Sequence, residues 1–244
     1  MEERVVSVGV LHSADLVSAS VRAADCKPVQ TLHEVSGWSK ENFAREQIRG
    51  LVRQVFFSSA SHPVRQVVFC AAESGGDIGG ICWRVAEALA LDVTGTVAMV
   101  RSDAIDDRQS LQADQAETEN PKTAGVGATT WRESAIRMKR NLWLLPQIRL
   151  VEDGTGTRLS FRLGEVRREF EYSIVQGPPA GESSEAAALG QSADGIVLVL
   201  AAHVTRRATA LKIKETLAAA QVRLLGTVLS ERRFPIPEGI YRRL

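Results

Sequence analysis

Short apolar runs alternate along the chain with stretches in which apolar residues recur every three or four positions. Continuous apolar runs such as Ile196-Val197-Leu198-Val199-Leu200 are typical of strands covered on both faces, because neither face needs polar residues. Runs of this kind predict strands at 5–11, 66–72, 96–101, 172–176, 195–201 and 223–229. The three- and four-residue spacing predicts helices at 39–57, 79–91, 183–191 and 205–221.

Alternating strands and helices predict an α/β fold, a doubly wound and mostly parallel sheet over about residues 40–230. We therefore place one domain at 39–244, preceded by an N-terminal extension at 1–38 whose structure the pattern does not define. Residues 104–130 are rich in Asp, Gln, Thr and Gly and predict a long mobile loop. The segment 154–169 fits both a hairpin and a helix.

A glycine-rich loop lies between the predicted strand at 66–72 and the helix at 79–91. Strand, glycine loop and helix in this order are the setting of a phosphate-binding P-loop, which reads Gly-x-x-x-x-Gly-Lys-Ser/Thr. Here Asp77 stands at the last glycine, Ile78 at the lysine and Gly79 at the hydroxyl residue. The remaining candidate for anion contact is the loop backbone near a helix N-terminus, at Gly75, Gly76, Gly79 and Gly80.

Composition narrows the classes of function. A chain of 244 residues, 44% hydrophobic and 24% charged, suits one large globular domain or two small ones. The net charge of +1 gives no field that would attract nucleic acid. The three cysteines and four histidines show neither disulfide nor metal-ligand spacing, so no metal is predicted. Because no secretory leader or membrane-length apolar run is seen, a cytoplasmic location is expected.

Three further segments carry a pattern beyond fold class. On the helix at 39–57, Glu46 and Arg49 match Glu-x-x-Arg, and Arg53 follows Val52, which replaces a second arginine. A strand ends in Gln176 and is followed by two prolines, where Asp-Thr-Pro-Pro is the related form. The tail reads Phe-Pro-Ile-Pro at 234–237 and Tyr-Arg-Arg at 241–243.

Together these segments resemble the cytoplasmic domain of bacterial tyrosine autokinases of capsular and exopolysaccharide synthesis, over about residues 41–244. These kinases belong to the deviant-Walker ATPases, with the Min and Par proteins. The resemblance implies a P-loop NTPase-like fold and, for Glu46, Arg49 and Arg53, a role in ring assembly. An ordinary amphipathic helix with an exposed ion pair is the alternative. The run 141–146 is similar to the family's strand before its central loop.

The resemblance also identifies what the chain lacks. In the family's second motif, Asp-x-Asp, the first aspartate is replaced by Arg101 and the second is kept as Asp103. In the third motif the aspartate is replaced by Gln176. Phosphoryl transfer needs a cation on the phosphates and carboxylates on magnesium. Beside a phosphate charge about 4 Å away, Asp77 would add repulsion of roughly 1 kcal/mol in water and about 4 kcal/mol near a protein surface. Arg101 could pair with Asp77 or attract an anion.

We therefore expect a catalytically inactive, kinase-like regulatory or scaffold protein of exopolysaccharide or capsule biosynthesis or export. It would use no ATP or magnesium and would bind a membrane polysaccharide co-polymerase or a kinase homologue, which could hold it at the inner face of the membrane. A homo-oligomer is compatible with this expectation, and nucleic acid is not an expected partner.

Two alternatives stay open. One is an ATP-dependent tyrosine autokinase or ATPase that uses displaced residues such as Lys27, Lys40 or Lys122, although Tyr241 is the only tyrosine near the end of the chain. The other is a sensor that binds a different anionic ligand at the glycine loop.

Overall fold

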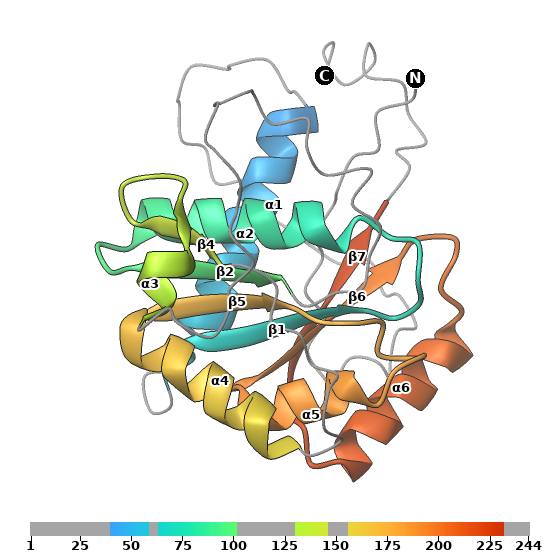
Figure 1. The fold of residues 1–244 in the computed structure, drawn as a ribbon. Helices are drawn as coiled ribbons and strands as arrows, with labels where there is room; N and C mark the ends of the chain where they lie inside the picture. The colour runs from blue at the N-terminus through green and yellow to red at the C-terminus, as the bar shows by residue number, and fades with distance from the viewer. Residues whose placement is uncertain (1–39, 59–62, 102–129, 146–155, 232–244) are drawn as a thin grey trace, which may run out of the picture.

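Within the described ranges 40–58, 63–101, 130–145 and 156–231 of the computed structural model, seven strands form one sheet in the order β3-β4-β2-β5-β1-β6-β7 (Figure 1). All neighbours are parallel except β3 and β4, which are antiparallel. The strands are β1 Gln66–Ala71, β2 Val97–Arg101, β3 Ile136–Arg137, β4 Leu142–Leu145, β5 Tyr172–Gln176, β6 Gly195–Ala201 and β7 Leu224–Ser230.

Helices cover both faces of this sheet. They are α1 Lys40–Phe56, α2 Ile78–Asp92, α3 Trp131–Ser134, α4 Gly156–Glu169, α5 Glu185–Ser192 and α6 Arg207–Ala219. Figure 1 shows α1 and α2 on one side, and α4, α5 and α6 on the other. None of the helices in the described ranges is both long and apolar enough to cross a bilayer.

Two apolar clusters, one on each face, explain the regular apolar spacing. In β1, Val67 and Phe69 point into the cluster that α1 and α2 cover, whereas Val68 and Cys70 point into the cluster under α4, α5 and α6. This is the period-two alternation of a strand buried on both sides. The buried residues of α2 follow the helical period and form one stripe, which consists of Ile78, Ile81, Cys82, Val85, Ala86, Leu89 and Ala90.

Asp194, just before β6, ties the amino ends of the central strands together. Its Oδ2 accepts hydrogen bonds from the backbone N–H groups of Arg65 and Gln66, at 2.7 and 2.9 Å. Its Oδ1 accepts one from Arg167 of α4, at 2.9 Å. One carboxylate thus joins β1, β6 and α4 at the amino ends of the strands, and the glycine loop lies at their carboxyl ends.

Most predicted elements are confirmed, with ends shifted by one or two residues at several of them. The segment 154–169 that fitted both a hairpin and a helix forms α4, and the run 141–146 contains β4. The short elements α3 and β3 were not predicted. The strand at 5–11, the extension 1–38 and nearly all of the loop at 104–130 lie outside the described residues.

Candidate functional site

The glycine loop lies where the parallel strands end. Because β1, β2 and β5 run in the same direction, the loop after β1 lies at the same edge as Arg101, the last residue of β2, and Gln176, the last residue of β5. Arg101 and Gln176 are register partners in neighbouring strands. The fold therefore brings the glycine loop, Arg101 and Gln176 together at the carboxyl ends of the strands. Asp103, the remaining motif position, lies outside the described residues.

Gln176 lies directly against the residue at the magnesium-hydroxyl position. Its side chain is buried, and a Cβ added to Gly79 would lie 3.6 Å from the Gln176 Oε1. The third-motif position thus faces the helix start, as a site for a metal would require. A neutral amide stands there in place of a carboxylate, and a hydrogen in place of a hydroxyl group.

Ile78, at the lysine position, is part of the protein core. It is 7% exposed and belongs to the same apolar cluster as Ile81 and Val199. Residues 72–80 contain no lysine or arginine, so no other alignment of the loop with the motif would supply the missing cation. The loop therefore offers a phosphate group no side-chain cation.

Two backbone N–H groups of the loop are bonded to the protein's own carboxylates. The Asp77 Oδ1 accepts a hydrogen bond from Gly80 N at 2.8 Å and caps α2. The Glu182 Oε1 accepts one from Ser74 N, also at 2.8 Å. In a working P-loop such amides face phosphate oxygens. Here an incoming anion would meet two fixed negative charges.

Glu182 reaches the loop because the segment after β5 runs alongside it. Gly177 N, Ala180 N and Gly181 N donate hydrogen bonds to the backbone oxygens of Phe69, Ala71 and Ala72, respectively. A Cβ at Gly181 would lie 2.6 Å from the Ala72 oxygen, so only glycine permits this approach. The doubled proline of the sequence therefore belongs to a segment that is fastened to the glycine loop.

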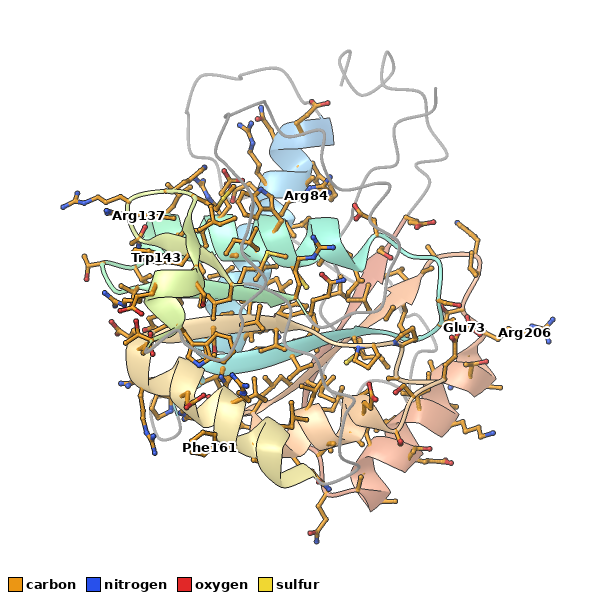
Figure 2. The ribbon with its side chains drawn as sticks, in the orientation of Figure 1. Glu73, Arg84, Arg137, Trp143, Phe161 and Arg206 are labelled. Carbon is orange, nitrogen blue, oxygen red and sulfur yellow. The ribbon has the colours of Figure 1, made fainter. Side chains whose placement is uncertain are left out.

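A hollow of about 80 Å³ opens beside the loop, at the ends of β1, β6 and β7. Its apolar wall includes Ile78, Val199 and Val204, and its charged lining residues are Glu73 and Glu231. Figure 2 shows Glu73 at this end of the molecule, with the nearby Arg206 side chain directed outward into solvent. A nucleotide would therefore find an acidic approach to the glycine loop.

Helix α1 presents the predicted assembly residues to solvent. Arg49 and Glu46 form an ion pair at 3.0 Å, with the two side chains 49% and 67% exposed, and Arg53 is exposed in the last turn. Val52, where a second arginine would stand, is fully buried. A valine in place of the arginine therefore fits this position, because here α1 packs against the rest of the apolar core. An ion pair this exposed contributes little stability, so the helix does not need it to fold.

The structure also bears on a possible metal site and on the lysines that could replace the missing one. Among the described residues, no group of three or more His, Cys, Asp and Glu side chains is placed to hold a metal ion. Lys27 and Lys122 lie outside the described residues, and Lys40 is the first residue of α1.

Cys70 and Cys82, behind the loop, are buried on opposite faces of the sheet. Burial raises the pKa of the Cys70 thiol to about 12, and it raises the pKa of Cys82 further. Because the thiolate is the reactive form, both should alkylate on the order of a hundredfold or more slowly in the folded protein than in denaturant. Peptide mass spectrometry after timed iodoacetamide treatment measures this, and equal native and denatured rates would contradict the burial.

Of three comparisons with known proteins, only the one with solved structures finds similar chains. No protein-family model matches the sequence, and no curated protein matches it. Among solved structures, the chimerical protein CapA2B2 has 19% identity and a TM-score of 0.63, with 78% of this chain and 85% of that chain covered. The kinase domain of the Escherichia coli tyrosine kinase ETK has 17% identity and a TM-score of 0.58, with 80% and 78% covered.

A ParA family ATPase from Chlorobium tepidum has 15% identity and a TM-score of 0.50, with 68% of this chain and 72% of that chain covered. At these identities the likeness defines the fold alone. The chain has the P-loop ATPase fold that tyrosine kinase domains share with ParA proteins, as the sequence resemblance predicted.

Proposed function

We propose that this chain, with the fold of a tyrosine kinase domain, is a non-catalytic regulatory or scaffold protein of exopolysaccharide or capsule biosynthesis or export. The observation that carries the proposal is the bonding of glycine-loop amides to Asp77 and Glu182. These carboxylates of the protein accept hydrogen bonds from loop N–H groups that could otherwise donate to an anion.

The replaced motif residues support the same conclusion. At the positions of the lysine, the hydroxyl and the third-motif carboxylate stand Ile78, Gly79 and Gln176, and Gln176 lies against Gly79. Electrostatic stabilisation of the transferred phosphoryl group normally contributes several kcal/mol to catalysis. Without a cation in the loop and without this carboxylate, little of that stabilisation is left.

Binding is the mode of action that these features favour. The exposed Glu46, Arg49 and Arg53 of α1 offer a polar surface for a kinase homologue or for the cytoplasmic part of a membrane polysaccharide co-polymerase. A homo-oligomer would use the same surface.

Loss of cell-surface polysaccharide on deletion of the gene would support the pathway, and unchanged polysaccharide would contradict it.

Nucleotide titration tests the loss of catalysis. We expect calorimetry to detect no magnesium-dependent binding of ATP or ADP to the full chain, and phosphate release to stay at the buffer rate. Magnesium-dependent binding or turnover would overturn the proposal and favour the ATP-dependent enzyme.

Charge-neutral variants test the reason for that loss. Glu182→Gln and Asp77→Asn keep an oxygen acceptor for the loop amides and remove one negative charge each. For inorganic tripolyphosphate, each change should raise the affinity about fivefold at low salt, since a charge about 4 Å away contributes about 1 kcal/mol in water. Glu171→Gln, at the other end of β5, is the matched control and should have no effect. Equal effects of all three changes would show that only net charge matters.

A further inference from the structure

Three large apolar side chains are exposed at the β3 edge of the sheet. Leu91 at the end of α2 is 70% exposed, Ile136 in β3 is 54% exposed and Met138 in the following turn is 41% exposed. Arg137, Lys139 and Arg140 lie among them in the sequence and are also exposed. These six residues are called the hairpin edge below.

Two contacts hold the two parts of the hairpin edge together. Lys139 in the β3–β4 turn forms an ion pair with Glu87 of α2, and Leu91 lies one helical turn beyond Glu87 on the same face. The Asn141 amide donates to the backbone oxygens of Ala90, Val93 and Gly95, each at 3.0 Å. The exposed end of α2 and the turn therefore form one continuous surface.

The charge of this surface is positive at its tip. Residues 136–140 contain three cations and no carboxylate. Glu87 offsets Lys139, and Asp92 lies at the margin of the surface. Within the described part of the chain, neither Arg137 nor Arg140 forms an ion pair, so both charges are available to a partner.

The turn is held in place although it projects from the sheet. The Arg137 guanidinium lies 5.5 Å from the centre of the Trp143 ring and donates hydrogen bonds to the Arg140 backbone oxygen. Arg132 lies 5.7 Å from the same ring. Figure 2 shows Arg137 and Trp143 together at this edge, at the opposite side of the molecule from Arg206. Such contacts stabilise one conformation of the turn and reduce the entropy that binding would cost.

We propose that the hairpin edge binds the surface of a lipid bilayer that contains anionic headgroups. A projecting tip with apolar side chains among cations fits a flat interface, where apolar groups enter the headgroup region and cations meet lipid phosphates. A two-residue edge strand is too short to align an added strand of a partner protein. Contact through the hairpin edge goes beyond the proposed function, because it would place the chain at a membrane without a protein partner.

Vesicle co-sedimentation of the full chain tests this inference. We expect binding at low salt to vesicles of phosphatidylcholine mixed with phosphatidylglycerol, and little binding to phosphatidylcholine alone or at high salt. Arg140→Glu should lower the partition coefficient about tenfold or more, because each cation near an anionic surface contributes about a fivefold factor and a reversal removes more than one. Met138→Ser should lower it severalfold by removing apolar contact.

Matched variants separate this surface from general charge and hydrophobicity. Arg206→Glu on the far side and Phe161→Ser, whose exposed ring lies on α4, repeat the two kinds of change elsewhere and should leave binding unaltered. The side chain of Arg140 is exposed and forms no hydrogen bond or ion pair with the described residues, so its variant should fold normally, and circular dichroism checks this. Equal binding to both lipids, no binding at low salt, or equal losses in the control variants would overturn the proposal. If the true partner is an acidic protein, the chain should not bind either kind of vesicle at low salt.

Discussion

Replacing Asp194 by alanine should lower the free energy of unfolding by about 3–4 kcal/mol, among the largest effects expected of a single polar residue in this chain. Its carboxylate accepts three hydrogen bonds, and its side chain is only 17% exposed. The variant leaves the N–H of the buried Gln66 and that of Arg65 without their acceptor, and Arg167 without its partner. Urea unfolding followed by circular dichroism measures the change.

Two further variants make the expectation for Asp194 specific. Asp194→Asn keeps one acceptor oxygen and should lose about half as much stability, since an amide cannot accept on both sides. Glu215→Ala on the exposed face of α6 removes a carboxylate that forms no ion pair or hydrogen bond with the described residues, and it should change stability by less than about 0.5 kcal/mol. If Asp194→Ala unfolds at the same urea concentration as the wild type, this carboxylate does not hold the strands together.

Replacing Ile78 by lysine should destabilise the protein by about 2–4 kcal/mol and should not create an ATPase. The change restores the lysine of the motif in sequence, but Ile78 is 7% exposed and packs with Ile81 and Val199. The variant loses apolar packing, and its amine must either stay near neutral in the core or turn into the hollow beside the loop. Because Gly79, Gln176 and Glu182 are unchanged, ATP would still lack a metal site.

A volume-matched control distinguishes the charge from a general intolerance of change at this site. Ile78→Met keeps an apolar side chain of similar size and should cost less than about 1.5 kcal/mol. Thermal unfolding and phosphate release are measured on the same preparations. Magnesium-dependent ATP hydrolysis by Ile78→Lys would mean that the loop lacks only its lysine, and that Gly79, Gln176 and Glu182 do not prevent catalysis.

The fold could be predicted where burial imposes a simple pattern. Strands β1 and β6 are covered on both faces, and their continuous apolar sequences admit few other interpretations. The sequence of α4 was ambiguous because arginines and Gly164 separate its apolar residues, and packing against α5 and the sheet decides for a helix. The two exposed residues of β3 carry no period from which a strand could be inferred.

The candidate site was predictable residue by residue but not in its contacts. The sequence identified Gln176 and Gly79 separately, as replacements at two motif positions, and only the structure shows that they lie against each other. The bond from Ser74 to Glu182 spans 108 residues and depends on the close approach of Gly181 to the Ala72 oxygen. No local sequence pattern predicts such a contact, since Ser74 and Glu182 are each ordinary loop residues.

The position of β1 in the sheet has a consequence for how the chain is made. This strand pairs with β5 and β6, and β5 begins roughly 100 residues after β1 ends. At a typical rate of translation, the ribosome needs about 5–20 s to supply that partner. During this interval the segment Val67-Val68-Phe69-Cys70 has both strand edges open. A nascent chain in this state is prone to aggregate, so chaperones that shield emerging β-forming segments would favour its correct assembly.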